Sequence, residues 1–363
     1  MLYTVRYGDT IASIAAVHHI SPASLYTANQ MDPHIKSIPG QSIIIPDESS
    51  PIRSLIIHGC AMPNVGDTAL SYAAPYLSCI SICSCRIQTD GSIIPPNDCS
   101  LTSRAHSLGI SPLLHITNQR QGGEFSGSLL HAFIHNNEAT ASFAEMLLQY
   151  LFHRNYMGVN IEFDCIYPED NQACSDFLHR IGSILRNHQL KLFISTSDIS
   201  GLLPCIYDCA DRIIILPNLR YHASQPPAPI CPIEEMRKSI QQALHICKAE
   251  KLMLALPYYG CNWTLPYHGG IARTVYLSEI PSLAYNHYAD IRYDDTVQAP
   301  LFSYYDSAGT EHIVWFHDPR SISARVKLTE EYHLGGISLG NIAPPYRPGW
   351  IPVADMYSPR KEL

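Results

Sequence analysis

Short apolar runs rich in β-branched residues recur after residue 53, and helical patterns of apolar residues lie between several of them. Eight such runs are predicted strands: Leu55–Ile57, Cys79–Ile82, Pro112–Ile116, Gly158–Phe163, Leu192–Ser195, Ile213–Leu216, Leu252–Leu256 and Gly336–Leu339. Predicted helices include Ala141–His153, Cys174–Asn187 and Ile233–Ala249. Eight strands that alternate with helices predict an α/β fold of the (β/α)8 class, a TIM barrel.

The interval 261–317, after the seventh predicted strand, is too long for a single helix. It contains two further strand-like runs, at Ile291–Tyr293 and His312–Phe316. We therefore expect a small α+β insertion at 261–317, within a barrel domain that spans 53–357 and is followed by a short tail at 358–363.

The first 46 residues have a pattern of their own, in the order strand, helix, helix, strand. Tyr3–Val5 is a predicted strand, and the turn Gly8–Thr10 leads into a helix that Asp9 or Thr10 is placed to cap. Ser42–Pro46 closes the unit as a second strand. The polar stretch 47–52 is predicted to be a linker, too short for wide independent motion.

This unit, residues 1–46, resembles a LysM module along nearly its whole length. The matching features are Tyr3-Thr4-Val5, Gly8-Asp9-Thr10, the helix Ile11–Ala15, Asn29, and Pro39-Gly40-Gln41 before Ile43. The resemblance implies binding of chitin or peptidoglycan chains, with contacts around Gly8, Asp9, Thr10 and Ile11 and around Met31–His34. Gly8 and Asp9 also suit a turn and a helix cap, and the two interpretations are compatible.

Composition and charge narrow the possible partners. The 363 residues are 46% hydrophobic and 15% charged, with a net charge of −8 and no long basic run, so nucleic acid and acidic lipid are poor candidate partners. No stretch reaches the roughly 18–20 apolar residues that a membrane span needs. The N-terminus lacks the basic start and apolar core of a signal peptide, so we expect synthesis in the cytosol.

The 12 cysteines do not have the spacing of a metal site. Cys83 and Cys85 alternate along a predicted strand, Cys205 and Cys209 lie in a loop or helix, and no paired C-x2-C set is present. We expect no metal and no cofactor. Two interpretations of the cysteines stay open: buried free thiols that pack as small hydrophobes, or later cross-linking, since 22 tyrosines accompany them.

The fourth predicted strand carries three polar residues on one face. Asn160, Glu162 and Asp164 follow one another at intervals of two and therefore point into the barrel, with Asp164 nearest the mouth. Polar groups inside a barrel are costly unless they are paired. Ion pairs of purely structural purpose can explain such a set, but an active site at the carboxyl ends of the strands is the favoured interpretation.

Residues 53–357 resemble a family 18 glycoside hydrolase, above all the LysM-bearing spore cortex-lytic N-acetylglucosaminidases of endospore formers. The matching stretches are Asp90-Gly91-Ser92, Pro95-Pro96, Pro112-Leu113-Leu114, Thr117-Asn118, Gly158-Val159-Asn160-Ile161, Leu256-Pro257-Tyr258-Tyr259-Gly260, Trp263-Thr264-Leu265-Pro266-Tyr267, Ala272-Arg273-Thr274 and His312-Ile313-Val314-Trp315-Phe316. In that family the fourth strand ends in Asp-x-Glu. The Glu protonates the glycosidic oxygen, and the Asp orients the acetamido group of the substrate, which attacks the anomeric carbon.

In this chain the order of the two acids is reversed, with Glu162 at the Asp position and Asp164 at the Glu position. Two residues along a strand span about 6.6 Å, whereas Glu exceeds Asp by one methylene, on the order of 1.5 Å. Asp164 can act as the acid only if sugar or backbone shifts by about 1 Å, a misplacement that can cost about 100-fold in rate. Asp also needs a larger rise in pKa than Glu to keep its proton near neutral pH.

Two further departures from the family pattern weigh against efficient hydrolysis. The resemblance implies a tyrosine after the sixth strand that contacts the acetamido group, but the corresponding stretch is Leu216-Pro217-Asn218. It also implies a tryptophan on the eighth strand as the floor under the sugar ring, and Gly340 stands there.

Aromatic residues after the seventh strand are candidate platforms for sugar rings. They are Tyr258, Tyr259, Trp263 and Tyr267. Arg220 and Tyr221 are further candidates for the same cleft. The alternative is that these aromatic rings pack in the core and anchor loops.

We therefore expect a protein of the spore envelope that binds peptidoglycan or another N-acetylglucosamine polymer, with spore coat proteins as possible partners and hydrolysis weak or lost. The alternative is an active N-acetylglucosaminidase, with a substrate-assisted retaining mechanism, that uses Asp164 as its acid. A chitin-degrading enzyme outside spores is disfavoured, because it would need a secretion signal.

Overall fold

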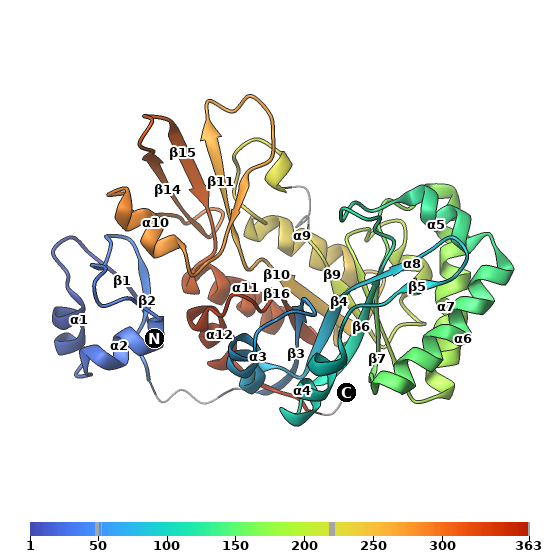
Figure 1. Cartoon of the computed structure of the whole chain (residues 1–363). Coiled ribbons are helices and arrows are strands. Elements are labelled where there is room, and N and C mark those ends of the chain that lie inside the picture. The colour runs from blue at the N-terminus through green and yellow to red at the C-terminus, as the bar shows by residue number, and fades with distance from the viewer. Residues whose placement is uncertain (48–50, 52, 218–221, 362–363) are drawn as a thin grey trace.

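The computed structural model describes residues 1–47, 51, 53–217 and 222–361, and within them eight parallel strands close into a barrel (Figure 1). The strands are β3 (Arg53–Ala61), β4 (Cys79–Ile87), β6 (Ser111–Thr117), β7 (Gly158–Glu162), β8 (Lys191–Thr196), β9 (Arg212–Ile215), β10 (Leu252–Leu256) and β16 (Gly336–Asn341). Pairing of β3 with both β4 and β16 closes the ring. The predicted TIM barrel is confirmed. Each predicted strand overlaps one of these eight strands and extends past its end by at most one residue.

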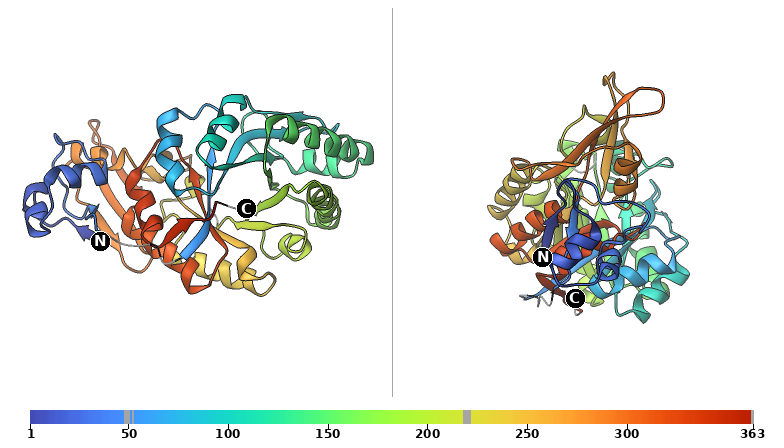
Figure 2. Two further views of the ribbon diagram at one scale, coloured as in Figure 1. Left: turned by 90° about the horizontal axis from the view of Figure 1, so that it is seen from below. Right: turned by 90° about the vertical axis from the view of Figure 1, so that its left-hand side faces the viewer.

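Helices follow most of the barrel strands and surround them (Figure 2). They are α3 (Asp67–Ala73), α4 (Cys99–Ser107), α5 (Gly127–Ile134), α6 (Asn137–Arg154), α7 (Asn171–Asn187), α8 (Leu203–Ile206), α9 (Ile233–Leu244), α11 (Pro319–Glu331) and α12 (Arg347–Ala354). Local sequence sets several ends: the Asn136 side chain caps α6, and Asn155 ends it in the left-handed conformation. Helix α9 ends at Leu244, five residues before the predicted end.

Alternation along the strands separates two apolar layers. The barrel interior is filled by Ile56, Cys79, Leu113, Phe193, Ile214, Met253 and Ala255. Residues one position along, such as Ile57 and Leu114, belong to the larger cluster that also holds the buried helix residues. This two-sided burial is why the strands appear in the sequence as continuous apolar runs.

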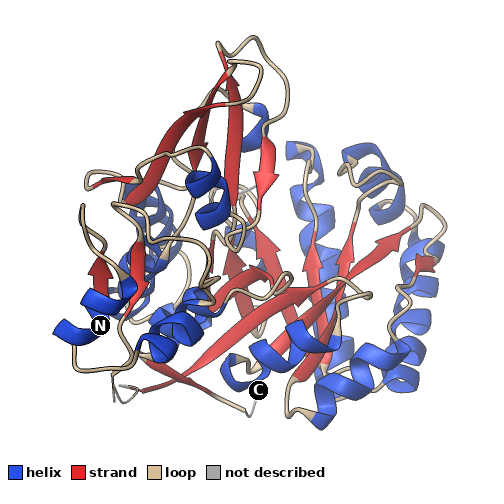
Figure 3. Ribbon diagram, turned by 60° about the vertical axis from the view of Figure 1, so that its left-hand side comes forward, coloured by secondary structure: helices blue, strands red, loops and turns tan. Residues whose placement is uncertain are grey.

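The chain between β10 and α11 forms the predicted α+β insertion, a second sheet that rises above the barrel (Figure 3). Its elements are β11 (Gly260–Leu265), β12 (Arg273–Val275), α10 (Ile280–Asn286), β13 (Arg292–Asp294), β14 (Ala299–Tyr305) and β15 (Glu311–Trp315). The antiparallel order is β12-β11-β15-β14-β13. Strands β11, β12 and β14 were not predicted: β11 carries Trp263, one of the aromatic residues that we had considered only as candidate sugar platforms, and β14 begins with Ala-Pro.

The N-terminal unit has the predicted order, with β1 (Leu2–Thr4), α1 (Ile11–Val17), α2 (Pro22–Asn29) and β2 (Ser42–Ile44). Strands β1 and β2 are antiparallel. The buried Asn29 ties α2 to β2: its amide donates to the carbonyls of Leu25 (3.0 Å) and Ile44 (2.8 Å) and accepts the Ile44 N–H (2.6 Å). The unit has its own small core, formed by Val5, Ile11, Ile14, Ala15, Leu25, Ile43 and Ile45.

Direct contacts dock the N-terminal unit on the insertion and on the last helices of the barrel (Figure 1). The Ile291 N–H donates to the Pro39 carbonyl (3.0 Å). The Arg320 guanidinium donates to the Gly40 carbonyl (2.9 Å). The Tyr7 hydroxyl donates to Asp290. These contacts restrain the unit, while most of the predicted linker 47–52 lies outside the described residues.

The chain end adds one strand to the barrel. Strand β17 (Tyr357–Pro359) pairs in parallel with the start of β3 and crosses residue 357, where we had placed the end of the barrel domain. The Lys361 ammonium then donates to the Leu77 carbonyl (2.6 Å). Among the described residues, no helix combines the length and the apolar character that crossing a membrane requires.

Gly40 and Gly8 give a matched test of the docking. Both have a left-handed backbone, with φ of +82° and +85°, so an alanine at either position costs about 1–2 kcal/mol. A Cβ on Gly40 would lie 1.7 Å from the Ile291 carbonyl oxygen, whereas one on Gly8 would meet nothing within 4 Å. We predict that Gly40→Ala lowers the free energy of unfolding by a further 1–3 kcal/mol, roughly the cost of overpacking, and increases protease cleavage near residue 50. Denaturant melts and limited proteolysis test this, and equal effects of the two variants would contradict it.

Candidate functional site

The three polar residues of the fourth barrel strand lie at successive depths toward the mouth. Asn160 is fully buried, Glu162 is the last residue of β7, and Asp164 follows in the loop. Gly158 begins the strand because a Cβ there would lie 2.1 Å from the Lys191 carbonyl oxygen on β8. Phe163 lies between the two acids and packs outward on Phe177 of α7. Strand parity therefore places Glu162, like Asn160, on the inner side, whereas Asp164 lies beyond the end of the strand.

Asn160 belongs to a buried chain of polar side chains that crosses the barrel interior. Its amide nitrogen donates to the Ser81 hydroxyl (3.2 Å), and its amide oxygen accepts the Ser195 hydroxyl (2.9 Å). The His58 ring continues the chain, with Nε2 at 2.7 Å from the Ser81 Oγ and Nδ1 at 2.8 Å from the Ser338 Oγ. These mutual hydrogen bonds offset the cost of burying five polar groups.

Burial keeps His58 neutral. Desolvation, with a smaller contribution from the charge of His115, lowers the pKa of His58 from 6.5 to about 3. A neutral imidazole has one donor and one acceptor nitrogen, which matches two serine hydroxyls that can serve either role.

Glu162 pairs with a histidine from the neighbouring strand. Its Oε2 lies 2.6 Å from the Nε2 of His115 on β6, and both side chains are mostly buried, at 15% and 11% exposure. The carboxylate is therefore held against the barrel wall. His115 was not among the predicted site residues, although its place two residues from Leu113 in the predicted third strand assigns it to the inner face.

Two thiols lie beside this pair. The Cys60 thiol on β3 shares a hydrogen bond with the sulfur of Cys83 on β4, which also lies beside His115. The bond from Cys60 and the neighbouring His115 hold the pKa of Cys83 well below its usual range, and the pKa of Cys60 rises in turn. A register irregularity after Ile82 sends Cys85 outward, so Cys83 and Cys85 face opposite layers despite their spacing.

The backbone of Asp164 is fixed by Asn118, which is itself fully buried. The Asn118 amide donates to the Asp164 carbonyl (2.8 Å) and accepts the Asp164 N–H (3.0 Å). The Asp164 carboxylate accepts the N–H of the next residue, Cys165 (2.7 Å). Burial raises the pKa of Asp164, the Cys165 N–H opposes that rise, and the charge of Asp198 adds to it.

The four aromatic candidates do not form one surface. Tyr258 is buried and donates to the Tyr346 carbonyl (2.6 Å). The Trp263 indole is buried and donates to the Gln225 carbonyl (2.8 Å), whereas Tyr259 is half-buried against the core. Tyr267 donates to the carbonyls of Ser224 and Gly270, both at 3.1 Å. Every hydroxyl or indole bond named here anchors a loop or helix end.

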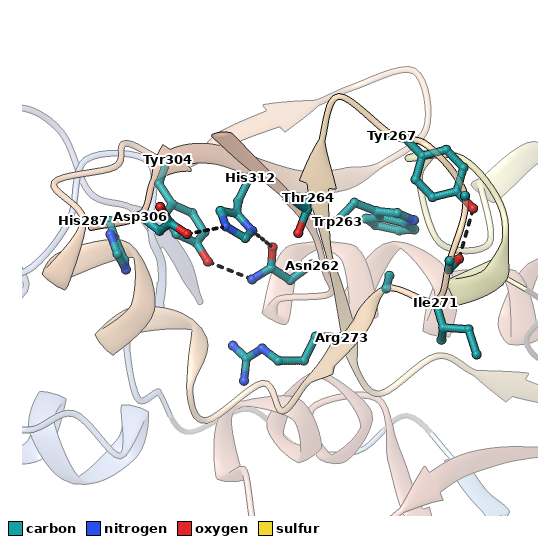
Figure 4. A pocket seen from close by; sticks show the side chains of 13 residues that line it. Asn262, Trp263, Thr264, Tyr267, Ile271, Arg273, His287, Tyr304, Asp306 and His312 are labelled. Atoms are coloured by element: carbon teal, nitrogen blue, oxygen red, sulfur yellow. Dashed lines mark hydrogen bonds and ion pairs between the residues drawn. The ribbon is translucent and has the colours of Figure 1, made fainter. Parts of the chain in front are cut away.

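Trp263 and Tyr267 line a cavity of about 440 Å³ in the insertion (Figure 4). Its polar wall is a chain of side chains on β11, β14 and β15, in which the Asn262 amide donates to the Tyr304 hydroxyl (2.8 Å). The His312 ring stacks on Tyr304 with 4.8 Å between centroids and lies 3.2 Å from the Asn262 Oδ1. Flat rings beside polar groups suit a sugar, and we regard this cavity as a second candidate surface.

Of the remaining predicted positions in the barrel, the structure describes one, Gly340. Asn218, Arg220 and Tyr221 fall outside the described residues. Gly340 is near the carboxyl end of β16, where a Cβ would meet nothing closer than 3.9 Å, so the position predicted to lack a stacking ring is open.

In the N-terminal unit the predicted contact residues also build the turn. The Asp9 carboxylate accepts the Tyr3 hydroxyl (2.7 Å) and the Arg6 N–H (2.8 Å), while Thr10 forms a capping box with Ser13. Gly8 is exposed. The structural roles proposed for Asp9 and Thr10 are thus present, and they leave the outer face of the turn accessible.

Comparison with known proteins gives the class of the chain. The family model described as "Glycosyl hydrolases family 18" matches residues 103–342, and the LysM domain model matches residues 3–46. The chain therefore belongs to glycosyl hydrolase family 18 and carries a LysM domain at its N-terminus.

Several of the most similar relatives come from Bacillus species. The chain is 29% identical to "Putative sporulation-specific glycosylase YdhD" of Bacillus subtilis over 96% of its own length and 86% of the relative's. It is 25% identical to the cortical fragment-lytic enzyme of the same strain, over 79% and 69% of the two chains. The crystal structure of the Bacillus cereus spore cortex-lytic enzyme SleL has the same fold, with a TM-score of 0.92, 23% identity and coverage of 100% and 99%.

The neutral His58 predicts loss of stability in acid. Between its unfolded pKa of 6.5 and its folded pKa of about 3, the unfolded chain binds a proton that the folded chain does not. Stability is then complete above about pH 6.5 and falls with decreasing pH by about 1.4 kcal/mol per unit. His58→Gln, which keeps a donor and an acceptor without titrating, should flatten this dependence in denaturant melts from pH 8 to pH 4. The exposed His153→Gln is the control, and an unchanged slope in His58→Gln would contradict the assignment.

Proposed function

We propose that this protein binds peptidoglycan, or another N-acetylglucosamine polymer, in the spore envelope and that its barrel hydrolyses the polymer weakly or not at all. The observation that carries the proposal is the reversed pair of acids, with Glu162 held by His115 at 2.6 Å. A carboxylate in that position is committed to an imidazole on the barrel wall. It is thus poorly placed to protonate a glycosidic oxygen that lies closer to the barrel mouth by about the length of two residues along the strand.

Asp164, at the position of the family's proton donor, offers a shorter side chain. Its carboxylate accepts the Cys165 N–H, a bond that favours the ionised form, whereas a proton donor must be protonated. Asn118 forms hydrogen bonds with both the N–H and the carbonyl of Asp164. These bonds restrain the loop, so the carboxylate has little freedom to move toward the sugar by about 1 Å.

The open position at Gly340 also favours weak turnover. Where the family resemblance implies a ring under the sugar, there is no side chain. Without that platform a sugar at the mouth gains less binding energy for distortion toward the transition state. The LysM domain would then supply most of the affinity for the polymer.

The alternative, an active N-acetylglucosaminidase, is favoured by one observation. Burial raises the pKa of Asp164, as a general acid requires, and the charge of Asp198 acts in the same direction. Asp164 would then protonate the glycosidic oxygen while the acetamido group of the substrate attacks the anomeric carbon.

A place in the spore envelope is proposed from the relatives, whose names refer to sporulation and to the cortex. The exposed thiols of Cys99 and Cys165 support contact with coat proteins, because they are accessible to oxidative cross-linking.

A turnover assay separates the two candidates. Purified chain is incubated with cortex fragments, and released reducing ends are compared for the native protein, Asp164→Ala and the exchanged pair Glu162→Asp with Asp164→Glu. We predict no release above Asp164→Ala for the native chain, retention on insoluble peptidoglycan, and a gain of activity in the exchanged pair. Release by the native protein that Asp164→Ala abolishes would establish the active enzyme instead.

Gly340 allows the missing platform to be restored. The position is open and its φ is not left-handed, so Gly340→Trp should fold and present a ring to the sugar. We predict an affinity for N-acetylglucosamine oligomers about 2- to 10-fold higher, from a stacking energy of about 0.5–1.5 kcal/mol. Gly340→Leu, which adds apolar volume without a ring, is the control in titration calorimetry. Equal affinities for the two variants would argue against a sugar at this position.

A further inference from the structure

Two histidines and an aspartate meet beside the loop that carries Asp164, apart from the polar chain of the barrel interior. His131 and His135 are four residues apart, on α5 and at its C-terminal end, so their rings lie on one face. Asp170 ends the short helix η2 (Pro168–Asp170) in the loop between β7 and α7. The cysteine spacing that argued against a metal site in the sequence says nothing about this His-x3-His pair, which was not predicted as a site.

The three side chains converge on one point. The Oδ1 of Asp170 lies 2.9 Å from the His131 Nδ1 and 2.9 Å from the His135 Nε2. The two ring centroids are 4.6 Å apart. The three ligand atoms lie within 4.8 Å of one another, and no other group of His, Cys, Asp or Glu side chains in the described part of the chain meets this condition.

Burial differs across the group in the way that a coordination site requires. The Asp170 side chain is 2% exposed, whereas the imidazoles of His131 and His135 are 50% and 49% exposed. The carboxylate therefore forms the buried floor of the group, and about half of each imidazole side chain is open to solvent. An open side leaves room for a water molecule as a further ligand.

The donor set selects the kind of ion. Two imidazole nitrogens and one carboxylate oxygen suit Zn²⁺ and the neighbouring divalent transition metals, whereas Mg²⁺ and Ca²⁺ prefer oxygen ligands alone. Tetrahedral bonds of about 2.0–2.1 Å separate ligand atoms by about 3.3 Å. The two nitrogen–oxygen separations of 2.9 Å need to widen by a few tenths of an ångström, and the two imidazole nitrogens, which lie within 4.8 Å of each other, need to approach.

From this geometry we propose that His131, His135 and Asp170 form a binding site for one divalent transition-metal ion, with Zn²⁺ as the reference ion. Such an ion replaces the hydrogen bonds between the imidazoles and the carboxylate, and the nitrogens that bind it carry no proton.

The site joins the loop of the candidate catalytic acid to α5. Asp170 is six residues after Asp164, and the loop between them already packs on the start of α5. A Cβ on Gly127 would lie 2.2 Å from the Cys165 carbonyl oxygen, and the Tyr167 ring lies 6.1 Å from the His131 ring. A bound ion would cross-link these two segments and reduce the motion of the loop.

The experiment uses the full chain without an affinity tag, stripped with a chelator and titrated with Zn²⁺ by calorimetry. We expect one equivalent to bind, and His135→Ala and Asp170→Asn each to weaken that binding by more than about 100-fold. The controls are His153→Ala, which removes an exposed histidine outside the group, and Cys60→Ser with Cys83→Ser, which removes the thiols at the barrel mouth. Both should bind Zn²⁺ like the native chain.

Co²⁺ gives a second readout, because its visible spectrum reports the ligands. The site predicts d–d bands without thiolate charge-transfer absorption, and it predicts slower hydrogen exchange in residues 163–170 when Zn²⁺ is added. Asp170 is buried, so Asp170→Asn can lose stability and binding together. His135 is half-exposed, so His135→Ala should fold normally and report on Zn²⁺ binding alone. Absence of stoichiometric binding, full binding by His135→Ala, or a thiolate spectrum would overturn the proposal.

Discussion

Polar side chains inside the barrel must find partners among themselves, because a closed ring of strands excludes water from its centre. The chain from Ser338 through His58 and Ser81 to Asn160 meets this requirement near mid-barrel, and the pair of His115 and Glu162 meets it closer to the mouth. This constraint determines which acidic side chains the candidate site can use for chemistry. Asn160 and Glu162 are committed to internal partners, and Asp164 is the next acid along the chain toward the mouth of the barrel.

The surrounding structure reinforces the same outcome. Asn118 fixes the Asp164 backbone, and Gly340 leaves the opposite side of the mouth open. The insertion carries its own cavity on β11, β14 and β15, and the LysM domain is docked against the insertion at Ile291. These candidate surfaces support the proposal that the protein holds wall material and cuts it weakly or not at all.

Local patterns predicted most of the fold. Each barrel strand is a short apolar run in the sequence, and several helix ends are marked by capping residues. The sequence also predicted that Asn160, Glu162 and Asp164 point inward, since parity along a strand is a local property. The partners of these residues were beyond such reasoning. His115 and Ser195 come from neighbouring strands, 47 and 35 residues away from Glu162 and Asn160. The surroundings of Trp263 depend on β11. The alternation of buried and exposed residues along that strand was not recognisable within an aromatic-rich stretch.

The central proposal is that the protein binds an N-acetylglucosamine chain while its barrel cuts that chain weakly or not at all, and one NMR experiment tests both parts. A defined N-acetylglucosamine hexamer is incubated with the native chain and followed by proton NMR over a day. The account predicts broadening of the oligosaccharide resonances on addition of protein, with no new anomeric signals from shorter products. Growth of new reducing-end signals at a rate above that of Asp164→Ala would contradict it.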